Sequence, residues 1–237
     1  MRLEGSRDRM RAAHHRRVVL IGAIALLSPG CSNHRSDAAA TLAITDVTVV
    51  DVRNGALRPN QTVVVRDGRM EAVGPTTELR APRRATVVSG AGGYLIPGLW
   101  DMHVHAARDG RALRFWPLFL AHGVTGIRET GSYLDSLLYW RRVAQANPDQ
   151  APRIVWSSPM IDGDRPLFDH AQVVRSPEEA RAVVAQMRNH GFGYLKAYSG
   201  LSREAFFALS DEARRLGLVI AGELPNGVAP AEGAAAG

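Results

Sequence analysis

From residue 94 onward, short apolar segments alternate with longer amphipathic segments, and this alternation restricts the fold more than any other feature. The apolar segments have the length of strands, whereas the others carry apolar residues at helical spacing. Regular alternation of strands and helices is typical of a parallel sheet with right-handed crossovers. We therefore predict an α/β fold. The expected strands lie near 95–105, 124–128, 154–157, 194–198 and 219–223, and the expected helices near 111–122, 133–146, 177–189 and 202–216.

A different pattern occupies residues 42–93, where short β-prone runs are separated by turn signals. Asn54-Gly55 and Asp67-Gly68 are dipeptides that favour tight hairpin turns. Strands of this length and spacing predict a small β-sandwich. The chain is therefore expected to contain an N-terminal β-sandwich domain at 42–93 and a second domain at 94–237.

The N-terminus has the pattern of a bacterial lipoprotein signal peptide. An arginine-rich segment precedes an apolar run at 18–27, and the only cysteine, Cys31, follows shortly after. The run is too short to span a bilayer, which takes about 20 residues. We expect a signal peptide at 1–31, a tether at 32–41, and a lipid anchor on Cys31 that holds the protein in the cell envelope. Lipoprotein signals usually have a leucine three places before the cysteine, and here that position holds Ser28. Plain secretion and an incidental free cysteine therefore stay open as alternatives.

The positive charge of the chain is concentrated in this leader. The formal net charge is +6, but residues 1–30 hold six arginines and only two acidic residues. The remainder is close to neutral. A nearly balanced body has no electrostatic signature of nucleic-acid binding, so we expect no nucleic-acid partner.

Lys196 is the only lysine of the chain, against 28 arginines. A GC-rich genome explains why most basic residues are arginine, but it does not explain why one lysine is kept at position 196. An amine can lose its proton, attack a carbonyl carbon or be carboxylated by CO2, whereas a guanidinium stays charged at any working pH. Because Lys196 lies in the apolar strand 193–198, it is a candidate for chemistry. The alternative is a lysine at the end of a strand that reaches solvent.

His103 and His105 lie two residues apart at the end of an expected strand. Residues i and i+2 share one face of a strand, so both imidazoles can reach one ion at about 2.0 to 2.1 Å. The pair therefore predicts a metal site. His170 carries a weaker signal, because it lies in a loop rich in aspartate. We interpret it as an ordinary surface residue, with the rim of a substrate site as the alternative.

The segment 95–105, which reads LIPGLWDMHVH, resembles the first barrel strand of the amidohydrolase superfamily. The similarity is greatest to its imidazolonepropionase-like and prolidase-like metal-dependent hydrolases. Residues 62–69, 123–128 and 195–198 also resemble that family. The resemblance implies a (β/α)8 barrel of the TIM type beside a small β-sandwich. Residues 94–237 would then form a partial barrel with about five of its eight strands.

The resemblance also implies a site. By it, His103 and His105 bind the more buried metal, and Lys196, as a carbamate, bridges two metals. The implied cofactor is one or two divalent ions, zinc first. The implied reaction is hydrolysis of a C–N bond in a small amide, cyclic amide or dipeptide by a metal-activated hydroxide. Tyr198 would contact substrate or serve in packing, and Arg128 would face a substrate carboxylate or brace loops.

One residue departs from the family pattern at the fifth expected strand. Glu223 stands where the family has a metal-binding histidine. A carboxylate can bind zinc, and as a harder ligand it would shift the preference of the site toward manganese or iron. The alternative is that the second metal site is lost.

The sequence also lacks the family's later functional residues. No histidine follows His190, and the chain stops near the start of the expected fifth helix. By the resemblance, a later histidine on strand six and the catalytic aspartate on strand eight, the general base, are therefore missing. We therefore expect a truncated barrel with negligible activity. Its open edges would allow self-association. The alternative function is that of a non-catalytic envelope lipoprotein, a pseudoenzyme fragment that binds a partner or dimerises.

Overall fold

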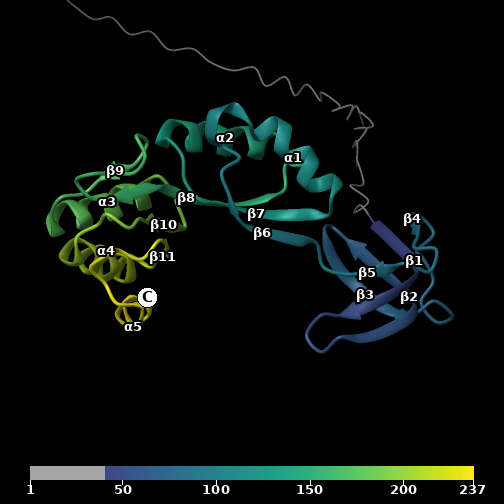
Figure 1. Ribbon diagram of the computed structural model, residues 1–237. Coiled ribbons are helices and arrows are strands. Elements are labelled where there is room, and N and C mark those ends of the chain that lie inside the picture. The colour runs from purple at the N-terminus through teal and green to yellow at the C-terminus, as the bar shows by residue number, and fades with distance from the viewer. Residues whose placement is uncertain (1–40) are drawn as a thin grey trace, which may run out of the picture.

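The computed structural model describes residues 41–237, and the chain forms two parts (Figure 1). A β-sheet lies at one end, and a curved sheet with helices forms the rest. The expected signal peptide, tether and lipid anchor at Cys31 lie outside the described residues. Within those residues, no helix is both long enough and apolar enough to cross a bilayer.

The N-terminal part is one mixed five-stranded sheet. Antiparallel hairpins join β1 to β2 and β2 to β3, while β4 and β5 pair parallel to β1. Gly55 and Gly68 adopt positive φ in the two hairpin turns, as the turn signals predicted. The described residues thus supply one sheet where the sequence predicted a small sandwich. The strands are β1 (Thr41–Asp51), β2 (Ala56–Arg66), β3 (Arg69–Pro75), β4 (Thr86–Ser89) and β5 (Tyr94–Leu95).

The second part is a half-barrel, and it confirms the predicted α/β fold. Five parallel strands follow the order β11-β10-β8-β7-β6, and the short β9 (Gln172–Val173) pairs with β8. Each strand therefore lies beside its predecessor in the chain, as in the first part of a (β/α)8 barrel. The strands are β6 (Leu99–Val104), β7 (Val124–Glu129), β8 (Arg153–Asp162), β10 (Tyr194–Ala197) and β11 (Val219–Gly222).

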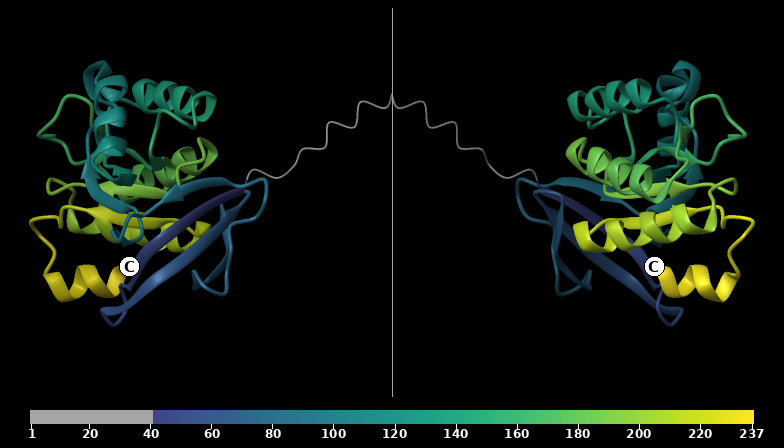
Figure 2. Two further views of the ribbon diagram at one scale, coloured as in Figure 1. Left: turned by 90° about the vertical axis from the view of Figure 1, so that its right-hand side faces the viewer. Right: turned by 90° about the vertical axis from the view of Figure 1, so that its left-hand side faces the viewer.

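The helices follow the strands and cover the outer side of the curved sheet (Figures 1 and 2). Ser176 and Ser202 cap two of them, each accepting a hydrogen bond from a backbone N–H three residues later. Gly217 ends the second of these in the left-handed conformation. The elements are η1 (Arg108–Gly110), α1 (Ala112–Ala121), α2 (Leu134–Ala146), α3 (Pro177–Asn189), α4 (Arg203–Leu216) and α5 (Pro230–Ala236).

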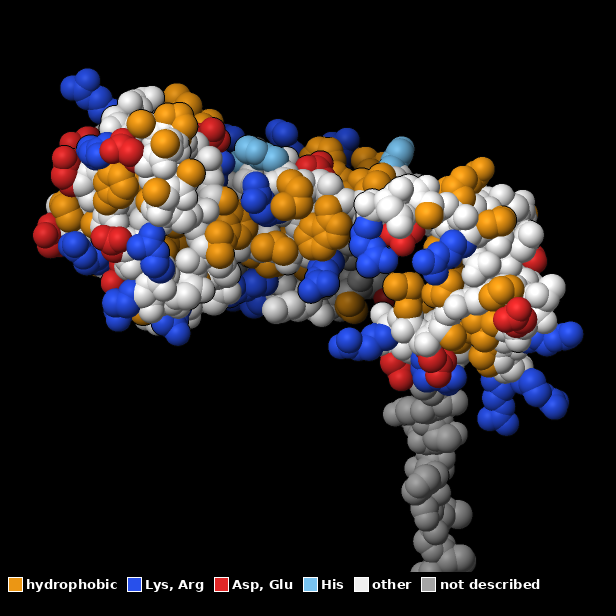
Figure 3. Space-filling view, turned by 90° about the horizontal axis from the view of Figure 1, so that it is seen from below, with side chains coloured by type: hydrophobic (Ala, Val, Ile, Leu, Met, Phe, Trp, Pro, Cys, Tyr) orange, Lys and Arg blue, Asp and Glu red, His pale blue; other side chains and the backbone are white. Residues whose placement is uncertain are grey.

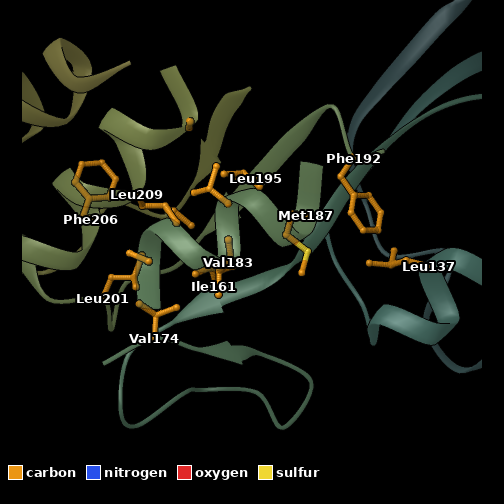
Figure 4. Close-up of a cluster of buried hydrophobic side chains, with 14 of the residues drawn as sticks. Leu137, Ile161, Val174, Val183, Met187, Phe192, Leu195, Leu201, Phe206 and Leu209 are labelled. Atoms are coloured by element: carbon orange, nitrogen blue, oxygen red, sulfur yellow. The ribbon is translucent and has the colours of Figure 1, made fainter. Parts of the chain in front are cut away.

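The main core lies between the curved sheet and its helices (Figure 4). Ile161 and Leu195, from two neighbouring strands, are completely buried there together with Met187 of α3. Elsewhere, large apolar side chains stay exposed, including Trp100 and Met102 on the edge strand β6. Figure 3 shows hydrophobic groups spread over one face of the molecule. The space between the curved sheet and its helices is thus well packed, whereas several large apolar side chains remain exposed to solvent.

The packing generates a prediction about stability. Leu195→Ala should lower the free energy of unfolding by about 2 to 5 kcal/mol, because the side chain is fully buried and its removal leaves a cavity. Val219→Ala is the matched control, since Val219 lies on the adjacent strand β11 with an exposed side chain. Urea denaturation monitored by circular dichroism measures both. Equal losses in the two variants would contradict the described core.

Candidate metal centre

The candidate residues gather at one edge of the curved sheet. His103 lies near the carboxyl end of β6, Lys196 near that of β10, and Glu223 directly follows β11. All strands of this sheet run parallel, so their carboxyl ends meet at the same side. In barrel enzymes this side holds the active site.

His103 and His105 lie side by side, as their spacing predicted. Their ring centroids are 5.4 Å apart, and the rings are tilted by 59°. His103 is exposed, whereas His105 is half-buried. The backbone N–H of His103 donates to Oδ1 of Asp101 at 3.1 Å, which fixes the strand end that carries the pair. The two imidazoles therefore form the start of a ligand set.

The surroundings of His105 determine which of its nitrogens is available. Nδ1 lies 2.9 Å from the carbonyl oxygen of Gly131, and because a carbonyl only accepts, Nδ1 must carry the proton. In the neutral ring Nε2 then holds a lone pair, 3.1 Å from Oγ1 of Thr130. Burial lowers the pKa of His105, and the charges of His103 and Lys196 act in the same direction. A neutral imidazole with an oriented N–H is the form that binds metals.

Lys196 is buried, so the interpretation of a lysine that reaches solvent is wrong. Its side chain is only 4% exposed, and Nζ lies 3.1 Å from Oε1 of Glu223. Nζ also lies 5.7 Å from the ring centroid of Tyr198. The backbone N–H of Lys196 donates to Oγ of Ser158 at 3.0 Å. The side chain of Lys196 therefore points to the carboxylate that follows β11.

Two residues named from the sequence have clear neighbours. Arg128 donates through Nε to the carbonyl oxygen of Met102 at 2.7 Å, and its guanidinium lies 5.5 Å from the ring centroid of Tyr194. These contacts brace β6, β7 and β10. The rings of Tyr198 and Phe168 pack edge to face with their centroids 5.7 Å apart. A second contact of the Tyr198 ring is with Nζ of Lys196. Tyr198 thus combines a packing role with a position at the site.

The described residues supply two candidate nitrogen ligands, His103 and His105, but no complete ligand set. Both imidazoles have nitrogen ligand atoms, and the contact of Nδ1 with Gly131 sets the tautomer of His105. Among residues 41–237, no three side chains of the types His, Cys, Asp and Glu lie close enough to hold an ion. The amine of Lys196, paired with Glu223, offers no lone pair while it stays protonated. The carbamate on Lys196 that the resemblance implies stays a prediction, and the structure shows Glu223 as the charged partner of the amine.

Glu129, at the end of β7, is a buried acid that the sequence analysis missed. Its Oε2 accepts the backbone N–H of Ala107 at 2.9 Å, and Oε1 has no hydrogen-bond partner within the described part of the chain. Burial raises the pKa of Glu129 to about 8. A polar residue at the carboxyl end of a barrel strand was the available signal. At neutral pH the side chain is mostly a protonated acid.

His170 is also buried, and its interpretation as a surface residue is wrong. Its side chain is 1% exposed, and Nδ1 lies 3.3 Å from Oδ1 of Asp169. The hydroxyl of Tyr133 donates to Oδ2 of the same carboxylate at 2.8 Å. The rings of Tyr133 and Phe168 each lie 5.3 Å from the imidazole. The loop after β8 therefore packs over the site side of the sheet through aromatic contacts.

Three known proteins resemble parts of this sequence or its fold. The adenine deaminase of Rubrobacter xylanophilus is 33% identical over 102 residues, which make up 43% of this chain and 16% of that protein. The imidazolonepropionase of Aromatoleum aromaticum is 43% identical over 65 residues, 27% of this chain and 16% of that protein. A Bifidobacterium longum protein assigned as a prolidase has a crystal structure that matches with a TM-score of 0.71 and 27% identity, over 84% of this chain and 53% of that one.

These matches cover only part of the relatives. The chain spans 16% of the length of each of the two curated proteins and about half of the solved structure. No model of a protein family matches the chain. The sequence and the fold nevertheless agree with the resemblance carried by residues 95–105.

The buried acid generates a prediction about pH. The pKa of Glu129 is about 8 in the folded chain and ordinarily 4.5, so between these values the folded state keeps a proton that the unfolded state has lost. The free energy of unfolding should therefore fall as pH rises from about 4.5 to 8, by up to about 1.4 kcal/mol per pH unit from this group, and this contribution should level off above. Glu129→Gln, which does not titrate, should remove that part of the pH dependence.

Urea denaturation at pH 5, 6.5 and 8 measures the effect. Glu204→Gln is the control, because Glu204 is an exposed glutamate in the first turn of α4. The prediction fails if wild type, Glu129→Gln and Glu204→Gln lose stability in parallel over this range.

Proposed function

We propose, from the premise that this chain belongs to the amidohydrolase superfamily, that its half-barrel carries part of the active site of a metal-dependent hydrolase of carbon–nitrogen bonds. One observation carries the proposal. His105 has its Nδ1 proton fixed on the carbonyl oxygen of Gly131, beside His103 at the carboxyl end of β6. A carbonyl that holds the Nδ1 proton leaves Nε2 as the ligand atom, and an ion there would take the place of the Thr130 hydroxyl that now lies 3.1 Å from it.

The proposed cofactor is a divalent ion, zinc first, held by His103 and His105. A bound zinc ion would supply a water of lowered pKa and polarise the carbonyl group next to the C–N bond that is cleaved. The chain contributes orientation, because the carbonyl oxygen of Gly131 accepts the Nδ1 proton of His105. Oγ1 of Thr130, which donates to the carbonyl oxygen of Val104, lies 3.1 Å from Nε2 on the other side of the ring. Manganese or iron becomes the better fit only if the carboxylate of Glu223 leaves its lysine partner and joins the ligands.

The proposed substrate is a small amide, a cyclic amide or a dipeptide. The related proteins are named as an adenine deaminase, an imidazolonepropionase and an assigned prolidase, so only the type of bond is carried over. Tyr198 is the residue best placed to contact a substrate, because its ring lies beside Lys196 at the site. Arg128 is assigned to bracing rather than to substrate, since its Nε is bound to the backbone of β6.

A second candidate function is association with a partner or with another copy of the chain. It rests on the exposed apolar side chains of Trp100 and Met102 on the edge strand β6. Sedimentation at several concentrations tests it. A monomer at all concentrations, together with tight zinc binding, would favour the hydrolase over this candidate.

Zinc binding tests the proposed site. His105→Ala should weaken zinc binding at least about 100-fold, because it removes one of two nitrogen ligands and the one with a fixed tautomer. His122→Ala is the matched control, since His122 is exposed and bonds only to a carbonyl within its own helix end. Isothermal titration calorimetry measures the affinities. Unchanged zinc affinity in His105→Ala, or an equal loss in His122→Ala, would refute the site.

The lipid anchor is a separate proposal, based on the apolar run at 18–27 and the cysteine that follows it. In bacterial cells that express the full chain, Cys31→Ser should move the protein from the membrane fraction to the soluble envelope fraction. Incorporation of labelled palmitate should disappear with it. Equal palmitate labelling of wild type and variant would show that Cys31 is not the lipidated residue.

A further inference from the structure

The contact between Lys196 and Glu223 is the most informative pair of charges in the half-barrel. Nζ and Oε1 lie 3.1 Å apart, and the lysine side chain is only 4% exposed. A buried ammonium is stable only with a counter-charge close by. Glu223 supplies that charge, and its backbone is held in place because its N–H donates to the carbonyl oxygen of Ala197 at 3.0 Å. The pair thus joins a buried lysine of β10 to a half-exposed carboxylate directly after β11.

The chemistry of a lysine carbamate conflicts with this pair. To form a carbamate, a neutral amine must attack the carbon of CO2. A new N–C bond forms, one C–O π bond becomes an oxyanion, and one proton passes from the nitrogen to water. The product carries a negative charge where the ammonium carried a positive one. A carboxylate at hydrogen-bond distance favours the ammonium and repels the carbamate. Glu223 therefore disfavours the neutral amine that the reaction needs and the negatively charged carbamate that it forms.

We propose that the ion pair between Lys196 and Glu223 takes the place of a metal-bridging carbamate, so that the site binds a single ion at His103 and His105. The position of the pair beside a metal rests on the proposed function. The ion pair itself does not, because it rests on the 3.1 Å contact between Nζ and Oε1. Glu223 thus determines how many metals the site can take.

The sequence allows an unusually direct test, because Lys196 is the only lysine. Protein grown with lysine labelled with 13C and 15N at the side-chain end gives one NMR signal from that group. The full chain is measured with zinc and 13C-bicarbonate, as wild type and as Glu223→Gln and Glu223→His. Glu232→Gln is the matched control: its carboxylate is 42% exposed against 47% for Glu223, and it also pairs with a cation, Arg203.

The expected result is an ammonium signal in wild type and in Glu232→Gln, with no coupling to bicarbonate carbon. Metal analysis should find about one zinc ion per chain in both. Glu223→Gln should show a carbamate signal, and Glu223→His should in addition raise the zinc content to about two ions per chain. Circular dichroism checks that each variant is folded.

Two results would overturn the proposal. The first is a carbamate signal in wild type, which needs no variant to fold. The second is an ammonium signal that stays unchanged in a folded Glu223→Gln chain. Absence of zinc from wild type would instead count against the proposed function, since the lysine signal still reports the state of the ion pair.

Discussion

The common direction of the five strands is the constraint on which the site depends. Because β6, β7, β8, β10 and β11 are all parallel, residues that end different strands reach the same edge of the sheet. His105 and Lys196 are 91 positions apart in the sequence, yet the charge of the lysine acts on the pKa of the histidine. Helices packed on the outer side fix the curvature that brings these ends together.

Residues beside the ligand pair do as much for the site as the pair itself. Gly131 determines the tautomer of His105, and Oγ1 of Thr130 lies 3.1 Å from Nε2 on the other side of the ring. Glu129 precedes them at the end of β7 and ties that strand to Ala107, two residues beyond His105. One short segment after β7 therefore positions the end of β6. Such support is what gives a ligand a defined orientation before any ion arrives.

The sequence predicted the order and type of the elements because their periodicity is local. The parallel half-barrel and the adjacent position of His103 and His105 follow from this pattern. The burial of His170 could not be predicted, since it depends on Tyr133, 37 positions earlier, and on the folding of an aspartate-rich loop over aromatic rings. The ion pair of Lys196 was missed for a similar reason. Glu223 is a possible metal ligand by its place in the sequence, and only the fold shows that Lys196 competes for its carboxylate.

The central claim is that one ion binds at the two histidines while Lys196 stays with Glu223. Anomalous X-ray scattering at the zinc edge, from crystals of the chain grown with zinc, locates metal directly. The expected map has a single zinc peak about 2.0 to 2.1 Å from Nε2 of His105, and no peak at Lys196. Two zinc peaks on either side of a carboxylated Lys196 side chain would contradict the claim.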